Sequence, residues 1–333
     1  MKDKGSVLMI SMWIVVILAM MAVGLGWRAS INLKMSGMQR DRMKAYFLAK
    51  AGLQRAILEL ESDKNDFDSL NETWSSGKDH MGKSVFENIG IGEGPGGSFS
   101  VGIIDEDSRI NVNTAPALLI TALLKECGIS SEEANGLSEY ICLWRGDDNP
   151  GYKKEAQPVL FKRSPLMNKA ELSAAFECFY ERSGRDDYLL QAKALYAKLK
   201  DLITVYPAKG EAKVNINTVS AAALKPLIDR ALASLRAEGQ DISFDPSTLR
   251  EKILEHREDN NFSDTKLREA IDISGPDETA CEMILSKLEE SIKTRSREFL
   301  ITVRAEAAKA GATRLIKCVY DREDDKVVYW SQN

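Results

Sequence analysis

The amino-acid sequence predicts an α+β protein in which a long N-terminal helix packs on an antiparallel sheet and a large all-α domain is inserted into the sheet domain. Three observations support this prediction. An uncharged apolar run opens the chain, a short asparagine-rich motif occurs twice in its middle, and strand-like segments precede the first copy and follow the second. With 333 residues, 44% of them hydrophobic, the chain can bury a substantial core.

The apolar run lies between Lys4 and Arg28 and carries no charge. About twenty apolar residues in a helix span a bilayer core of about 30 Å. A cleaved secretory signal has a shorter apolar stretch and ends in small residues, whereas here Arg28 follows without such a site. Residues 6–27 are therefore predicted to remain on the protein as a single transmembrane helix.

The helical pattern continues beyond Arg28, and the first proline of the chain is Pro95. We expect one helix from about Ser6 to about Glu61, roughly 80 Å long at 1.5 Å per residue. Apolar residues recur in its second half mostly at steps of three or four, which indicates one face packed on a sheet. These residues are Met43, Tyr46, Phe47, Leu53, Ala56, Ile57 and Leu60.

The motif N-x-N-T occurs at 111–114 and again at 215–218, each time before an apolar pattern of helical period. This spacing predicts a duplicated unit of about a hundred residues. We expect Thr or Asn of the motif to cap the following helix, and the first Asn to hold a turn. The motif residues are Asn111, Asn113, Thr114, Asn215, Asn217 and Thr218.

Strand periodicity appears near 98–105 and returns after Arg297, in segments rich in β-branched and aromatic residues. Because these strands flank the helical repeats, they are expected to form one sheet with the N-terminal helix on its face. The predicted division is a leader peptide at 1–5, a transmembrane half-helix at 6–27, the first part of the sheet domain at 28–107, an inserted helical domain at 108–295 with units of about 108–207 and 208–295, and the C-terminal strands at 296–333.

Composition and motifs exclude several classes of function. The formal net charge of -5 gives no general attraction to nucleic acid. No HExxH, GxSxG or Walker motif is present, so an enzyme is not expected. The two histidines lie far apart and the five cysteines form no CxxC pair, which argues against a zinc site.

The leader Met-Lys-Asp-Lys-Gly5 is followed at once by the apolar helix from Ser6. It resembles the signal of type IV pilins and type II secretion pseudopilins, in which a prepilin peptidase cuts after the glycine and methylates the new amino terminus. The resemblance therefore implies cleavage between Gly5 and Ser6. Major pilins carry a glutamate at the fifth mature position, where this chain has Ile10. Since an unpaired charge in lipid is costly, Ile10 suits a subunit with no subunit above it.

The order of elements resembles the general secretion protein K family over essentially the full chain: a long anchor helix, a strand, D-E-D-S-R-I-N-V-N-T, helices, a second N-I-N-T, helices and three strands. The resemblance implies a non-enzymatic minor pseudopilin at the tip of the type II secretion pseudopilus, acting in assembly initiation and protein export. It implies a single span in the bacterial inner membrane and a C-terminal part in the periplasm. Implied partners are the I- and J-type minor pseudopilins, the major pseudopilin, the prepilin peptidase, secreted cargo and the outer-membrane secretin.

Members of that family carry an acidic stretch after a tryptophan that is associated with calcium. Here Trp144 is followed by Asp147, Asp148 and Glu155, which the resemblance makes a candidate calcium site. Gly146 stands where the family has a first carboxylate, and the spacing is not that of an EF-hand loop. A solvated acidic turn explains the same residues equally well, and no other cofactor is indicated.

The alternative function is that of a membrane-anchored DNA-binding protein of competence type, because I-N-x-N-T also opens helix-hairpin-helix modules. Those modules hold phosphate on a G-x-G turn. The first copy has only Gly128 near this place, and the second has no glycine before Gly239. An acidic chain also lacks the counterion-release driving force for binding DNA. The sequence therefore favours a protein that binds no nucleic acid.

Overall fold

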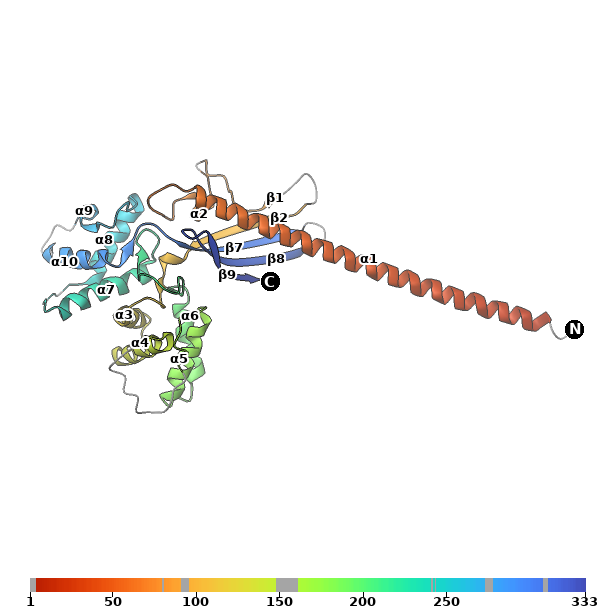
Figure 1. Ribbon diagram of the computed structural model, residues 1–333, viewed down its shortest axis with the longest axis horizontal. Coiled ribbons are helices and arrows are strands. Elements are labelled where there is room, and N and C mark those ends of the chain that lie inside the picture. Colours follow the sequence, from red (N-terminus) through yellow and green to blue (C-terminus); the bar gives the residue numbers. More distant parts are fainter. Residues whose placement is uncertain are drawn as a thin grey trace.

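The structure is a computed structural model that describes residues 4–79, 81–90, 96–147, 161–240, 242, 244–272, 278–307 and 311–333. It confirms the predicted fold class. Helix α1 (Lys4–Ser62) runs without a break for 59 residues. Its first half protrudes from the rest of the molecule, and its second half lies along a sheet (Figure 1). The transmembrane and packing halves predicted from the sequence are thus parts of one helix.

Small residues bring α1 close to the sheet. Ala45, Ala49 and Ala56 are fully buried at spacings that place them on one helix face. Gly52 lies on the same side, and a Cβ atom there would come within 2.6 Å of Cγ1 of Val303. The absence of a side chain at this position therefore sets how closely the helix approaches the strand.

The sheet contains five strands in the described part of the chain, in the order β1-β2-β7-β8-β9, and every neighbouring pair is antiparallel. The central pair joins distant parts of the sequence, with Ser98 opposite Glu306 and Asp105 opposite Phe299. The strands are β1 (Ile89–Gly90), β2 (Ser98–Asp105), β7 (Glu298–Ala307), β8 (Ala312–Asp321) and β9 (Lys326–Gln332).

The chain between β2 and β7 forms two helical units with the same order of elements. Each unit begins and ends with a two-residue strand, and these two strands pair in parallel. The first unit contains β3 (Ile110–Asn111), α3 (Ala117–Glu126), α4 (Ser131–Arg145), α5 (Ala170–Arg182), α6 (Tyr188–Leu199) and β4 (Ile203–Thr204). The second contains β5 (Val214–Asn215), α7 (Ala221–Ala237), α8 (Pro246–Asp259), α9 (Leu267–Ala270), α10 (Glu278–Glu289) and β6 (Ile292–Lys293).

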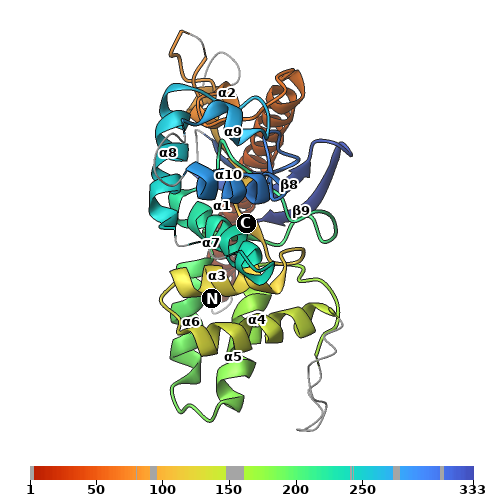
Figure 2. The same ribbon diagram turned by 90° about the vertical axis from the view of Figure 1, so that its left-hand side faces the viewer.

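Two hydrophobic cores hold these parts together. One lies between α1 and the sheet and includes Leu60, Phe99 and Val303. The other runs through both helical units, which lie one above the other in Figure 2 with α3 against α7. Short elements complete the chain: α2 (Thr73–Ser76) follows α1, and the 3-10 turn η1 (Glu106–Ser108) leads from β2 into the first unit.

Candidate assembly surface

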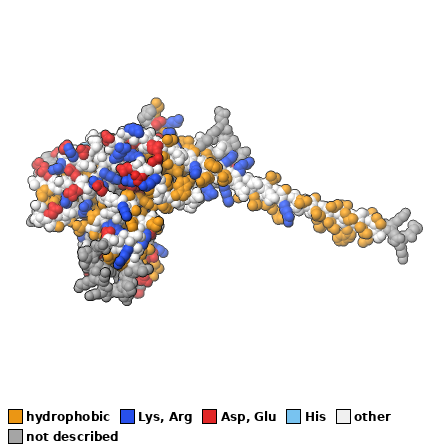
Figure 3. Space-filling view, in the orientation of Figure 1, with side chains coloured by type: hydrophobic (Ala, Val, Ile, Leu, Met, Phe, Trp, Pro, Cys, Tyr) orange, Lys and Arg blue, Asp and Glu red, His pale blue; other side chains and the backbone are white. Residues whose placement is uncertain are grey.

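The protruding half of α1 is apolar, and its side chains from Ser6 onward are exposed. The segment from Ser6 to Ser62 is long and apolar enough to cross a membrane, and its most apolar 18-residue window is 0% buried. Figure 3 shows hydrophobic side chains along this half. Ile10, predicted at the fifth mature position, lies here and is 60% exposed. Gly5 and Ser6 lie in the first turn of α1, whereas residues 1–3 of the predicted leader lie outside the described residues.

Apolar side chains also line the face of α1 that points away from the sheet. Met43, Phe47 and Leu58 are each more than half exposed. At 100° per residue they share one side of the helix, opposite the buried alanines. The second half of α1 therefore packs on the sheet with one face and presents a second apolar face to its surroundings.

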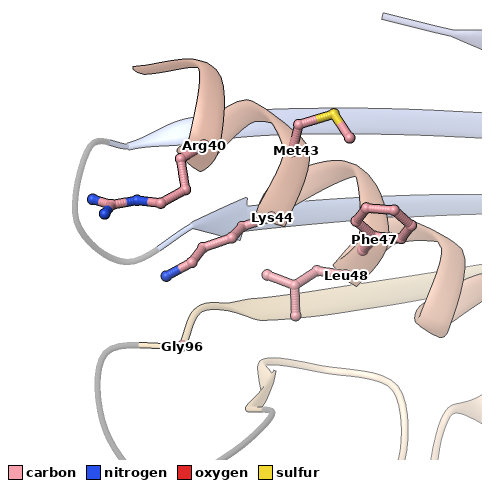
Figure 4. A pocket seen from close by; sticks show the side chains of 6 residues that line it. All are labelled: Arg40, Met43, Lys44, Phe47, Leu48 and Gly96. Carbon is pink, nitrogen blue, oxygen red and sulfur yellow. The ribbon is translucent and has the colours of Figure 1, made fainter. Parts of the chain in front are cut away.

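A groove of 410 Å³ runs beside this exposed face, between α1 and the start of β2. In Figure 4, Leu48 and Lys44 point toward Gly96, while Met43 and Phe47 lie on the other side of the helix. Lys44 forms no ion pair with any residue that the structure describes. The groove thus has apolar walls and a cationic rim formed by Arg40 and Lys44.

The N-x-N-T motifs hold the ends of the helical units. In each copy the side chain of the first asparagine accepts a hydrogen bond from the amide of the second, at 2.9 Å for Asn111 with Asn113 and 2.9 Å for Asn215 with Asn217. This is the predicted turn. The motif residues thus lie at the two parallel strand pairs.

The second asparagine of each motif binds the backbone of a distant loop. Asn113 donates to the carbonyl oxygen of Leu166 at 2.9 Å and accepts from its amide at 2.7 Å. Asn217 makes the matching pair with Phe262, at 2.9 Å and 2.8 Å. Each side chain therefore closes its unit across the helical hairpin, a role that the sequence analysis did not predict because the partners lie far along the chain.

An arginine repeats the same symmetry. The guanidinium of Arg145, at the end of α4, donates to the carbonyl oxygen of Val112. That of Arg257, near the end of α8, donates to the carbonyl oxygen of Ile216 at 3.3 Å. Val112 and Ile216 occupy the same place in the two motifs, so the duplication extends to the polar contacts of the units.

One expectation about the repeats was wrong, and one similarity between them was not predicted. The motif residues do not cap the following helices: α3 has Pro116 at its N-cap without a side-chain bond, and α7 is capped by Ser220. Both lie beyond the motif, because the turn at the asparagines separates it from the helix. The second unit also has a glycine matching Gly128. Gly239 ends α7 as Gly128 ends α3, both with φ near +90°, and it lies later in sequence because α7 is longer.

The second unit is joined to the sheet through the buried carboxylate of Asp105, at the end of β2. It accepts hydrogen bonds from Ser296 Oγ at 2.6 Å, from Asn215 Nδ2 at 3.3 Å and from the hydroxyl of Thr218. Burial raises the pKa of Asp105 to about 7, and the nearby negative charge of Asp107 adds to this. Two residues of the second motif thus dock on the sheet domain.

More charged groups surround this joint. Asp107 contacts Lys293 Nζ at 2.6 Å, and burial with the charge of Asp107 raises the pKa of Glu298 to about 8. Asp68, which is fully buried, pairs with Arg322 at 2.6 Å and 2.9 Å and accepts from the Ser296 amide at 2.6 Å. The joint is therefore a buried polar network that fixes the helical units to the sheet and to the segment that follows the C-terminal end of α1.

The candidate calcium residues are only partly described. Asp148 and Glu155 lie outside the described residues, and the carboxylate of Asp147 is bound by the guanidinium of Arg145, with Nε at 2.9 Å. A separate group of carboxylates, Asp63, Asp68 and Glu72, has oxygens within 4.8 Å of one another. Its charge is met by protein groups, chiefly Arg322. Calcium binding thus stays a prediction that rests on the sequence.

Neither a scan against protein-family models nor a search of curated proteins found a match. A solved structure does match: a chain of the GspK-GspI-GspJ complex from the enterotoxigenic Escherichia coli type 2 secretion system. The TM-score is 0.53 at 16% sequence identity, and the match covers 92% of this chain and 99% of that one. The match takes in both the sheet domain and the helical units, so this chain has the fold of a subunit from that secretion complex.

Proposed function

We propose that this protein is a minor pseudopilin of a type II secretion system. The observation that carries the proposal is the combination of a fold shared over nearly the whole chain with a protruding apolar half of α1. That half anchors the protein in the bacterial inner membrane by a single span, and the sheet and helical units lie in the periplasm. The role is structural: the chain starts pseudopilus assembly and supports protein export.

The partners follow from the same proposal. The protein assembles with the I- and J-type minor pseudopilins and, below them, with the major pseudopilin, through the exposed apolar face of α1. Met43, Phe47 and the groove beside them supply the contact in the periplasmic part. At the fibre tip, the helical units point away from the inner membrane. There they contact secreted cargo and the outer-membrane secretin.

Co-purification tests the proposal. The full-length chain, extracted in mild detergent from cells that express the I- and J-type pseudopilins, is expected to retain both. Phe47→Asp places a charge in the apolar face and is expected to lower recovery of the partners at least tenfold. Leu190→Asp is the matched control, because Leu190 is 70% exposed but lies on α6 in the helical units. Loss of partners in neither variant, or in both, would refute assembly through α1.

Processing gives an independent test. Prepilin peptidase is expected to cleave between Gly5 and Ser6 and to leave an N-methylated Ser6 on the extracted protein, which mass spectrometry measures directly. Gly5→Leu is expected to retain the leader, since the peptidase acts after a small residue. Recovery of intact Met1 from cells with an active peptidase would contradict this part of the proposal.

A further inference from the structure

The two edges of the sheet differ in how they are covered. At one edge, β1 pairs with the first residues of β2, and Val101 further along donates to the carbonyl oxygen of Phe86 at 2.8 Å. At the other edge, β9 pairs only with β8 among the described residues. The pairing continues to Asn333, which exchanges two hydrogen bonds of 3.0 Å with Leu315. No described strand therefore pairs with the outward side of β9, whose contact with the loop after β4 is through the rings of Tyr329 and Tyr206, 6.1 Å apart.

The side chains of β9 do not protect this edge. Val327, Val328, Tyr329 and Trp330 are 36–42% exposed and belong to both faces of the sheet. Native proteins usually protect an open edge with charges, proline, a β-bulge or a very short strand. The register of β9 against β8 shifts between Val327 and Tyr329, so Val328 is an extra residue and the regular edge runs from Tyr329 to Asn333. Within β9 the only charged residue is Lys326, at its first position. An apolar edge strand of this kind is a template for the addition of another strand.

The neighbouring strand adds positive charge on both faces. Lys317 lies opposite Ser331 and is exposed, and Arg314 lies on β8 beside the last residues of the chain. Neither forms an ion pair with a described residue, and Nε of Arg314 is buried without a hydrogen-bond partner in the described part of the protein. A strand added beside β9 would meet a cation on either face.

We propose that β9 binds an extended acidic segment of a partner protein as a sixth strand of the sheet. The free edge of β9 requires an extended chain, the exposed side chains of β9 favour apolar residues, and Arg314 and Lys317, one on each face, favour Asp or Glu on the face that each occupies. The proposal does not depend on membrane anchoring or on assembly through α1. It adds a second interaction surface on the opposite side of the sheet domain.

Peptide binding to the full-length protein in detergent micelles tests the proposal. The probe is a fluorescently labelled, end-capped octapeptide of alternating valine and glutamate, and binding is followed by fluorescence anisotropy. It is expected to bind saturably, while the valine and lysine counterpart and a backbone N-methylated version bind at least tenfold more weakly. Hydrogen exchange should show new protection of β9 amides. Equal binding of all three peptides would overturn the proposal.

Variants of the protein distinguish binding at β9 from nonspecific binding of the peptide. Val328→Lys is expected to weaken binding about tenfold, whereas Ile104→Lys, at an equally exposed position on β2, leaves it unchanged. Lys317→Glu, which changes one exposed side chain, is expected to shift preference toward the lysine peptide. This second variant decides the question if Val328→Lys does not fold. If neither Val328→Lys nor Lys317→Glu changes the affinity for the peptides, β9 is not the binding site.

Discussion

Oγ of Ser296 lies 2.6 Å from Oδ2 of Asp105, so the segment that leaves the second helical unit is tied to the strand that leads into the first. Both residues are buried, and Asn215 of the second motif binds each of them. One carboxylate thus connects the start and the end of the insertion. The stability of the sheet domain and the helical units should therefore depend on the protonation of Asp105.

The first prediction concerns pH. The pKa of Asp105 is raised from 3.8 to about 7, so the folded state holds its proton more tightly than the unfolded state. That stabilisation is complete below the unfolded value and is lost as pH rises through about 7. The free energy of unfolding is expected to fall by up to about 1.4 kcal/mol per pH unit between pH 5 and pH 7 from this group. Chemical denaturation at a series of pH values measures the slope.

Two substitutions of aspartate by asparagine test the pH prediction, one at Asp105 and one at an exposed control position. Asp105→Asn keeps the shape but removes the titration, so its slope should be smaller than that of the parent protein. Asp186→Asn, at an exposed position, should keep the parent slope. Identical slopes in all three proteins would show that Asp105 does not hold the proton.

The second prediction concerns the asparagine that closes the second unit. Asn217→Ala leaves the buried amide and carbonyl of Phe262 without partners. Each such loss costs about 1–3 kcal/mol, so the loss of both bonds is expected to lower the free energy of unfolding by about 2–6 kcal/mol. Urea denaturation followed by circular dichroism measures it. Asn260→Ala is the exposed control and should change stability by less than about 0.5 kcal/mol.

The third prediction concerns the buried ion pair at the joint. Arg322→Met removes both hydrogen bonds to Asp68, which then remains as a fully buried, unpaired carboxylate. A loss of about 3–5 kcal/mol in the free energy of unfolding is expected, because removing one partner of a buried ion pair leaves the other charge uncompensated. Arg295→Met removes an exposed arginine and should be close to neutral. An effect of Arg322→Met as small as that of Arg295→Met would contradict this prediction.

The fourth prediction tests the place of the subunit in the fibre. Ile10→Glu puts a carboxylate into the membrane half of α1, at a cost of up to about 2.5–3.5 kcal/mol at the bilayer centre and less near the interface. A tip subunit has no neighbouring amino terminus to pair with it, so secretion and assembly initiation should decrease modestly. Immunogold labelling of assembled fibres reads the position. Increased incorporation along the shaft would place the subunit inside the fibre instead.

The sequence predicts those helices and strands whose apolar pattern extends over many residues. The helix from Lys4 to Ser62 and strands β2, β7, β8 and β9 repeat their apolar pattern over many residues, and the structure confirms them. The pairs β3–β4 and β5–β6 were not predicted, since strands of two residues show no periodicity. Local pattern therefore predicts elements well and says little about how distant elements pair.

The polar residues show the same division. The turn from Asn111 to Asn113 lies within the motif and was predicted from it. The bonds of Asn113 to Leu166 and of Arg257 to Ile216 depend on contacts across a folded unit, and no local signal indicates them. The joint at Asp105 was missed for the same reason. Comparison of the two repeats identifies the paired asparagines from the sequence alone, but not the distant groups that they bind.

The nesting of the helical units inside the sheet also constrains the order in which the chain folds. The pair β3–β4 forms within the first unit and the pair β5–β6 within the second. Strand β2 can pair with β7 only after both units have been synthesised. A folded insertion brings the ends of β2 and β7 together and removes much of the entropy cost of closing so long a loop. Domains generally fold as units during synthesis, with the N-terminal ones first. The helical units are therefore expected to fold first, although they come later in sequence than the strand that starts the sheet.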